Sequence, residues 1–295
     1  MSEPASESSA QRTNPRTTAV RAGLMRGGIE FRHTMTSFGE LLGWLWLPIV
    51  ALAVMFVLRD TPVPGTSFSL GSQAVPGVLA MNSVFSGLFG LAVALTMDRE
   101  DGTLLRAKAT PNGMIGYLVG AISAKAALVV ATLMLMLVPA AFVYDGIELS
   151  RPDAWLTLIW VLGLGLAALL PIGAVLGATV ANSRSLGLVM FAFLALSAVS
   201  GVFYPLTALP GWLQGIGQVF PLYWLGLGLR SALLPDALAV VEVGGSWRTV
   251  PTVVVLGLWA VAGAVLAPPL LRRAAARESG SAVAARKEQV AQRPA

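Results

Sequence analysis

The chain has no cysteine, a single histidine and few charged residues, which make up 12% of its 295 positions. Without cysteine there is no disulfide framework, no thiol nucleophile and no cysteine-bound metal. A soluble domain of this length would carry about a quarter charged residues, so the composition argues against an ordinary soluble protein. The histidine, His33, lies in a basic stretch before the first long apolar run, where we interpret it as a surface residue. The sequence therefore predicts no metal site.

Residues that would carry chemistry inside a membrane are also missing. The three lysines follow Ala107, Ala124 and Arg286, so none belongs to the Gly-Lys-Ser/Thr sequence of a phosphate-binding P-loop. The position of His33 leaves no base for an intramembrane serine protease. The acidic residues fall in predicted loops, tails or span edges, which leaves no aspartate pair for an intramembrane protease and no buried acid for an ion-coupled carrier. We expect no catalytic residue and no cofactor bound by this chain.

Long apolar runs are abundant, and 56% of the residues are hydrophobic. A helix needs about 20 apolar residues to cross the hydrocarbon core of a bilayer. The runs therefore predict an all-α, multi-pass protein of the cell membrane with six transmembrane helices. The expected spans are residues 41–58, 75–96, 115–143, 155–180, 186–204 and 250–271.

The basic residues predict the orientation of these spans. With six spans, fifteen Lys and Arg residues lie on the side of the two termini and four on the opposite side. Cytoplasmic loops carry an excess of Lys and Arg, so both termini are predicted to be cytoplasmic. Because the number of spans is even, residues 207–234 must enter and leave the membrane on the same, outer side. Pro210 and Pro221 break the helix there. We expect an extracytoplasmic re-entrant pair of short helices there; a surface loop with an amphipathic helix is the alternative.

The two ends of the chain differ in composition from the spans. Residues 1–15 are rich in Ser, Glu, Ala and Gln and are predicted to form a disordered tail. From residue 16 apolar residues alternate with arginines, which favours an interfacial elbow helix that Gly27-Gly28 would interrupt. A basic tail that only sets topology is the alternative. Residues 16–272 would form the transmembrane domain, and residues 273–295 a basic cytoplasmic tail.

A charged segment at residues 98–111 separates the second and third expected spans. Six of the eleven residues from Asp98 to Lys108 are charged. A protein that only had to sit in lipid would not need so dense a patch at a turn. We interpret the segment as a contact site for another cytoplasmic molecule; a solvated loop whose charges mark topology is the alternative.

Lys125 is the one charged residue well inside an expected span. Its side chain could contact an anionic substrate or a partner carbonyl. Two simpler readings remain, because Lys125 could snorkel to the cytoplasmic interface or the helix could begin later in the sequence.

Three stretches together resemble the permease subunits of type 2 ABC exporters. They are the charged segment with residues 112–120 after it, residues 200–214, and Phe220-Pro221-Leu222-Tyr223 followed by Arg230. The similarity covers about residues 20–272 and extends to the daunorubicin/doxorubicin-resistance-like drug exporters. It implies a separate cytoplasmic ABC ATPase, which would bind ATP and magnesium, and a second permease copy, as a homodimer or pseudo-dimer.

The resemblance also implies that the charged segment forms a short coupling helix on the ATPase. Thr103 would cap the N-terminus of this helix, Gly102 would relieve the turn before it, and Pro111 would separate it from the third span. The candidate coupling residues are Asp98, Arg99, Glu100, Gly102, Thr103, Arg106, Lys108 and Pro111.

The second and fifth spans would lie near the dimer seam and the substrate pathway, as the resemblance implies. Their polar and aromatic residues are the candidate substrate contacts, namely Asn82, Ser83, Phe85, Ser86, Phe89, Ser197 and Ser200. Small polar residues in spans also serve as packing contacts between helices, which is the alternative for the serines.

The predicted function is that of a membrane permease subunit, without enzymatic activity of its own, in an ATP-driven exporter. Its substrate would be an amphiphilic drug, antibiotic or lipid-like molecule. The alternatives are a polysaccharide or glycolipid exporter and a non-transporting structural or regulatory subunit. Membrane lipids are expected partners, whereas nucleic acid is not, because the sequence has no basic face with interleaved aromatics.

Overall fold

The computed structural model describes residues 14–57, 59–61, 70–144, 146–180 and 182–277. Most of the expected tails, residues 1–13 and 278–295, lies outside these ranges. Within them the chain is helical and contains no strand. The helices are α1 Pro15–Thr36, α2 Phe38–Val57, α3 Leu70–Asn82, η1 Ser83–Phe89, α4 Gly90–Glu100, α5 Thr103–Lys108, α6 Gly113–Val143, α7 Pro152–Thr179, α8 Ser183–Ala198, η2 Leu206–Ala208, α9 Gly211–Val219, α10 Pro221–Leu233, η3 Asp236–Val241 and α11 Thr249–Arg277.

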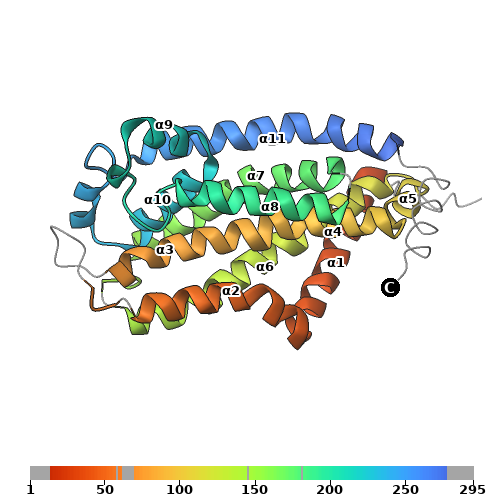
Figure 1. Cartoon of the computed structure of the whole chain (residues 1–295). Coiled ribbons are helices and arrows are strands. Elements are labelled where there is room, and N and C mark those ends of the chain that lie inside the picture. Colours follow the sequence, from red (N-terminus) through yellow and green to blue (C-terminus); the bar gives the residue numbers. More distant parts are fainter. Residues whose placement is uncertain (1–13, 58, 62–69, 145, 181, 278–295) are drawn as a thin grey trace, which may run out of the picture.

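The long helices run side by side along one axis of the molecule (Figure 1). In the described part of the chain, four of them are long and apolar enough to cross a membrane: residues 71–100, 113–143, 152–179 and 249–273. The apolar helix α8 is shorter, with 16 residues, and α2 has 20. The α5 helix and the last turns of α11 lie at one end of the bundle, while α9 and α10 lie toward the other (Figure 1).

The second expected span is longer than its apolar run indicates. The α3, η1 and α4 helices follow one another without a break from Leu70 to Glu100. The middle piece, η1, is a π-helix, a form that often marks functional sites. Asp98, Arg99 and Glu100 therefore form the last turn of a long helix rather than part of a separate coupling helix, which corrects one boundary of the expected segment.

The prediction that Gly27-Gly28 interrupts the N-terminal helix is wrong. The α1 helix continues through both glycines, because Gly23 and Gly27 are buried against Gly116 and Gly120 of α6. A Cβ atom on Gly23 would lie only 2.4 Å from the carbonyl oxygen of Gly116. Glycine spacing of four residues on both helices lets their backbones approach closely, as in small-residue packing between membrane helices.

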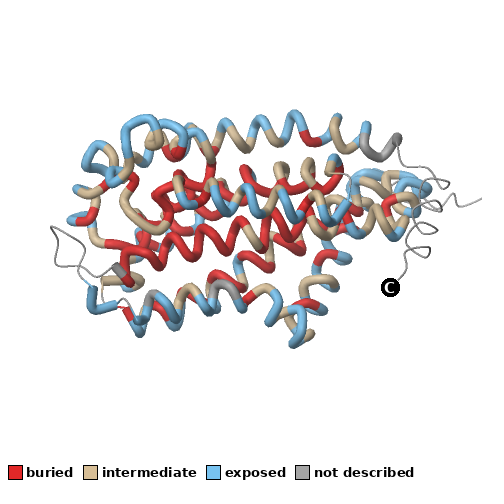
Figure 2. The backbone as a smooth tube through the Cα atoms, viewed as in Figure 1, coloured by how far each residue is buried: buried red, intermediate tan, exposed pale blue. Residues whose placement is uncertain are grey.

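The core of the bundle is built around the α3–η1–α4 run, α7 and α10, which Figure 2 shows in red as buried tubes. All described residues of α10 are buried except Ser231. The helix therefore packs on protein on all sides, although only 13 residues form it. The α11 helix, in contrast, exposes one apolar face along its length, including Val254, Leu258 and Val265.

The fifth expected span ends earlier than predicted, because α8 stops at Ala198 and residues 199–205 form turns. Two serine hydroxyls bond to backbone carbonyls in the last turn. Ser197 Oγ donates to the oxygen of Leu194 and Ser200 Oγ to that of Ser197, both at 2.6 Å. Gly201 then adopts a left-handed conformation with a φ of 64°. The apolar composition of this segment hid the turn from a hydropathy argument.

Candidate functional site

The carboxylate of Asp98 joins the end of α4 to two other helices. The hydroxyl of Tyr117, in α6, donates a hydrogen bond of 2.5 Å to Asp98 Oδ2. The guanidinium of Arg26, in α1, lies 3.9 Å from the same oxygen and 4.8 Å from the centre of the Tyr117 ring. Asp98 is therefore engaged within the chain.

The next two charges bind the turn between α7 and α8. Arg99 Nη1 donates to the carbonyl oxygens of Gly177 and Val180, at 3.1 and 2.9 Å. The carboxylate of Glu100 accepts hydrogen bonds from the backbone nitrogen and the hydroxyl of Ser183, at 3.1 and 3.2 Å. Arg99 satisfies carbonyls that the end of α7 leaves open, and Glu100 satisfies an amide at the start of α8. These contacts connect α4 rigidly to the α7–α8 turn.

The remaining part of the charged segment forms the one-and-a-half-turn helix α5. Gly102 precedes it with a φ of 77°, a conformation that glycine adopts without strain. The Thr103 side chain does not cap the helix, contrary to the prediction, because Gly102 occupies the N-cap position and Thr103 is the first helical residue. The Thr103 hydroxyl oxygen instead accepts a 3.1 Å hydrogen bond from Arg106 Nη2. Leu104 is buried in the core, whereas Arg106 and Lys108 are exposed.

A tight turn separates α5 from α6. Pro111 is exposed in this turn, and Asn112 after it has a φ of 55°. The amide of Gly113 donates to the carbonyl oxygen of Thr110 at 3.0 Å. A side chain on Gly113 would meet Thr110 Oγ1 at 1.8 Å, so this position has room for glycine alone. The α5 helix thus projects its charged face from a base that is fixed at Leu104 and at this turn.

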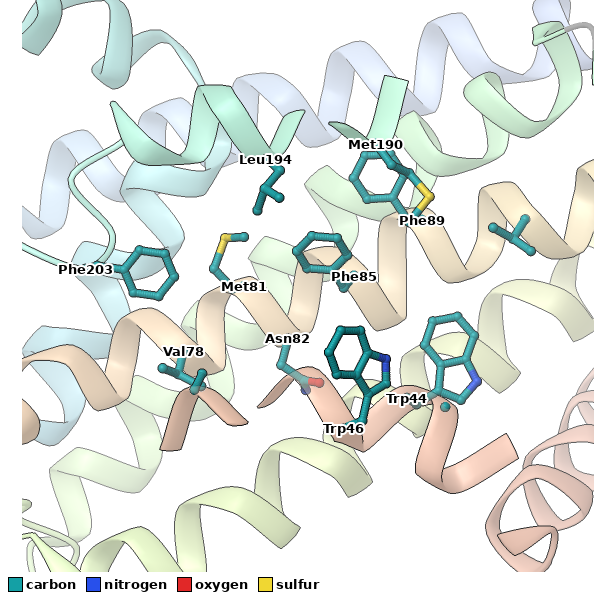
Figure 3. Close-up of a pocket in the computed structure, with 13 residues that line it drawn as sticks. Trp44, Trp46, Val78, Met81, Asn82, Phe85, Phe89, Met190, Leu194 and Phe203 are labelled. Atoms are coloured by element: carbon teal, nitrogen blue, oxygen red, sulfur yellow. The ribbon is translucent and has the colours of Figure 1, made fainter. Parts of the chain in front are cut away.

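A second feature is a cavity of about 300 Å³ between α2, the α3–η1–α4 run and α8. Figure 3 shows Trp46, Phe85 and Phe89 around its middle, Phe203 at one end and Trp44 at the other. Two methionines, Met81 and Met190, complete much of the remaining wall and adapt easily to different shapes. None of the thirteen lining residues, all from the described ranges, carries a charge.

Asn82 is the polar residue of this wall, and its side chain is already bonded. Its amide nitrogen donates to Thr132 Oγ1 at 2.8 Å, and its amide oxygen accepts from Ser86 Oγ at 3.1 Å. The hydroxyl of Ser83 donates to the oxygen of Leu79 at 3.0 Å. These bonds surround the start of the π-helix.

The structure thus brings together only part of the predicted substrate contacts. Asn82, Phe85 and Phe89 line the cavity, whereas the four candidate serines do not. Ser83, Ser86 and Ser197 direct their hydroxyls to acceptors in their own helices, and Ser200, in the turn after α8, bonds back to the last turn of that helix, as packing or turn-forming serines do. Sequence reasoning missed the tryptophans of α2, although the Trp44-x-Trp46 pair inside an apolar run was a visible signal.

Lys125 forms an ion pair that was not among the sequence-based alternatives. Its Nζ atom lies 3.1 Å from Glu30 Oε1 of α1, and the lysine side chain is almost completely buried. The ammonium also lies 5.9 Å from the centre of the Trp44 ring, at the end of the cavity. The sequence analysis placed Glu30 in the expected elbow helix before the first span, so its proximity to the third span could not be anticipated.

One comparison with known proteins identifies a family. A family scan matches residues 51–267 to the ABC-2 family transporter proteins, and this range contains η1, the charged segment and most of the cavity wall. A search of curated proteins gives no match. The matched range is most of the chain, and its apolar helices agree with a multi-pass protein of the cell membrane. The chain belongs to the ABC-2 transporter family, as a membrane permease component of an ABC transport system.

Proposed function

We propose that this permease exports an amphiphilic molecule, such as a drug, an antibiotic or a lipid-like compound, and that a separate cytoplasmic ABC ATPase drives it. The observation that carries the proposal is the uncharged, aromatic-walled cavity at the π-helix of the second span. Aromatic and methionine walls bind large apolar groups, whereas a polysaccharide would need many hydrogen-bonding side chains. Among the possible substrate classes, we favour that of the drug-exporter branch of the family.

The proposed topology has six spans, with α2 and α8 as the first and fifth. The α5 helix and the last turns of α11 lie at the same end of the bundle, in agreement with a cytoplasmic C-terminus (Figure 1). The α1 helix would be the elbow on the cytoplasmic leaflet. Its exposed residues Leu24, Met25 and Ile29 supply apolar area, and Arg21 and Arg32 supply charges for lipid headgroups.

The α5 helix is the proposed contact with the ATPase. Its exposed cations Arg106 and Lys108 would bind acidic groups on the partner, where each exposed pair contributes only about 0–1 kcal/mol and mainly sets register. Asp98, Arg99 and Glu100 would transmit force rather than bind the partner, because their side chains are bonded to α1, α6, α7 and α8.

A second copy of the permease would cover the open side of the cavity. The faces of α2 and α8 beside it expose large apolar side chains, among them Trp46, Val54, Leu188 and Phe191. Lipid could cover these faces in a monomer. In a homodimer the two cavities would face each other, which is the arrangement we propose.

The test is isolation of the permease from its native membrane with any ABC ATPase that co-purifies, followed by measurement of ATP hydrolysis with and without the permease. We expect stimulated hydrolysis, and we expect the Arg106→Glu/Lys108→Glu variant to lose the stimulation. Arg184→Glu is the matched control, since it reverses an exposed charge on α8 and leaves α5 intact. Full stimulation by the double variant would disprove the role of α5, and the absence of any associated ATPase would disprove the proposed function.

A further inference from the structure

A buried ion pair lies near the α9–α10 end of the bundle. Arg230, in the last turn of α10, and Glu242, directly after η3, each expose only 2% of their surface. Arg230 Nε lies 2.7 Å from Glu242 Oε1, and Arg230 Nη2 donates to Oε2 at 3.4 Å. A buried pair of this kind gains little net stability, because desolvation offsets the attraction, so it often specifies one conformation instead.

Arg230 connects a third segment to this pair. Its Nη1 atom donates to the carbonyl oxygens of Gly201 and Val202, at 3.2 and 3.4 Å. These carbonyls belong to the turn that follows α8, where Gly201 has its left-handed φ of 64°. One guanidinium therefore holds together α10, the segment after η3 and the end of α8.

The α3 helix also packs closely against the same turn. A Cβ atom on Gly77 would lie only 2.0 Å from the carbonyl oxygen of Val202, so the glycine makes room for this turn. Val202 is 1% exposed. Its backbone is thus fixed between Gly77 on α3 and Arg230 on α10.

The residue after Val202 is Phe203, which forms one end of the aromatic cavity. Figure 3 shows the Phe203 ring beside Met81 and Leu194, at the end opposite Trp44. The position of this ring depends on the turn that Arg230 holds. The guanidinium therefore controls the shape of the cavity although it does not line it.

We propose that Arg230 and Glu242 form a latch that keeps the Gly201–Phe203 turn closed over the outer end of the cavity, and that the turn is released around Gly201 when substrate leaves. Arg230 is in this scheme a positioning residue of the outer gate. The proposal rests on the proposed export function, since only that function makes the α9–α10 end the exit side. In this scheme, export through this end requires that the Phe203 ring move, and Arg230 bonds to the carbonyls of the two residues before it.

The absence of cysteine from the chain makes the turn accessible to a clean measurement. Val202→Cys introduces a single thiol at a position that is closed in this structure. The permease, in complex with its ATPase in vesicles, is exposed to a sulfonated maleimide with and without ATP. We expect slow labelling at rest and faster labelling during ATP turnover, because turnover opens the latch.

Adding Glu242→Gln removes the charge of the latch and keeps its shape. We expect labelling at rest to become about 10- to 100-fold faster, since hydrogen bonds to a charged group are weakened. Glu148→Gln is the matched control, because it weakens the partly exposed Arg151–Glu148 ion pair of 2.7 Å. The Glu148 amide bonds to the carbonyl oxygen of Leu233 in α10, so the control lies close to the same helix. This control should leave the labelling rate unchanged.

Two results would overturn the latch. The first is an equal labelling rate at rest with and without Glu242→Gln. The second is a labelling rate of Val202→Cys that ATP leaves unchanged, although the same complex shows stimulated ATP hydrolysis. In both results the coupling of the permease to its ATPase stands, because stimulated hydrolysis is measured on the same preparation. If Glu242→Gln fails to fold, Gly77→Ala replaces it, since its Cβ would displace the Val202 carbonyl that Arg230 holds and should also speed labelling.

Discussion

The packing of α1 on α6 can be tested with two glycines of the same helix. Gly23→Ala places a methyl group 2.4 Å from the carbonyl oxygen of Gly116, whereas ordinary contacts begin at 3.4 Å. The helices must therefore separate by about 1 Å, and overpacking of this kind costs about 1–3 kcal/mol. Alanine also favours helix over glycine by up to about 1 kcal/mol, which partly offsets the loss.

Gly28→Ala is the matched control, because nothing lies within 4 Å of a Cβ at this position. It receives the same gain in helix propensity and no packing penalty, so it should be neutral or slightly stabilising. The difference between the two variants isolates the packing contribution, about 1–3 kcal/mol, independently of propensity.

The assay is thermal unfolding of the purified permease, with the ATPase stimulation measured in parallel. For a protein of this size 1 kcal/mol shifts Tm by about 2–4 °C, so Gly23→Ala should unfold several degrees below Gly28→Ala. Gly23→Ala should also reduce the stimulation, since it shifts α1, which contacts Asp98 through Arg26. Equal Tm values for both variants would refute the close packing of α1 on α6.

Three further predictions concern buried groups. Asn82→Leu should destabilise the protein by about 1–3 kcal/mol and lower Tm accordingly, because it leaves the Thr132 hydroxyl without its side-chain donor. The same variant should also lower substrate-stimulated ATP hydrolysis. Phe89→Ala enlarges the cavity and should destabilise the protein by about 3–5 kcal/mol, while Phe142→Ala, at a position 87% exposed, should leave the Tm of the detergent-solubilised protein nearly unchanged. Glu30→Gln leaves the almost buried charge of Lys125 without its ion-pair partner, so it should destabilise the protein more than the double variant Glu30→Gln/Lys125→Met does. A double-mutant cycle in Tm would detect this non-additive pattern.

The helical class, the membrane location and the transporter family followed from the sequence, because long apolar runs and short motifs are local signals. The expected third span, residues 115–143, differs by two residues at its start from α6, and α7 extends the fourth span by three residues at its N-terminus. Apolar composition was less informative for α8, since the turn at Gly201 contains residues that are as apolar as a span. The number of membrane crossings remains a prediction.

The site was harder to predict, because its contacts join residues that lie far apart in the sequence. Glu30 meets Lys125, and Glu242 meets Arg230, across turns that hydropathy does not describe. The serines of the second span were candidate pathway residues because the sequence does not show where their hydroxyls bond. In the structure their acceptors lie one turn earlier in the same helix. Gly27 was taken as a helix breaker because its packing partner on α6 was unknown.

The charges of the 98–111 segment divide into two groups with different physical environments. Asp98, Arg99 and Glu100 bond to α6, to the end of α7 and to the start of α8, whereas Arg106 projects outward from α5. A force applied to α5 reaches Leu104 and the short Asp101–Gly102 turn first, and these are fixed to the same bundle. In the proposed coupling role, the inward group would therefore distribute the displacement over several helices at once. A permease that responds to a partner needs this rigidity, because a loosely attached α5 would move alone and leave the cavity unchanged.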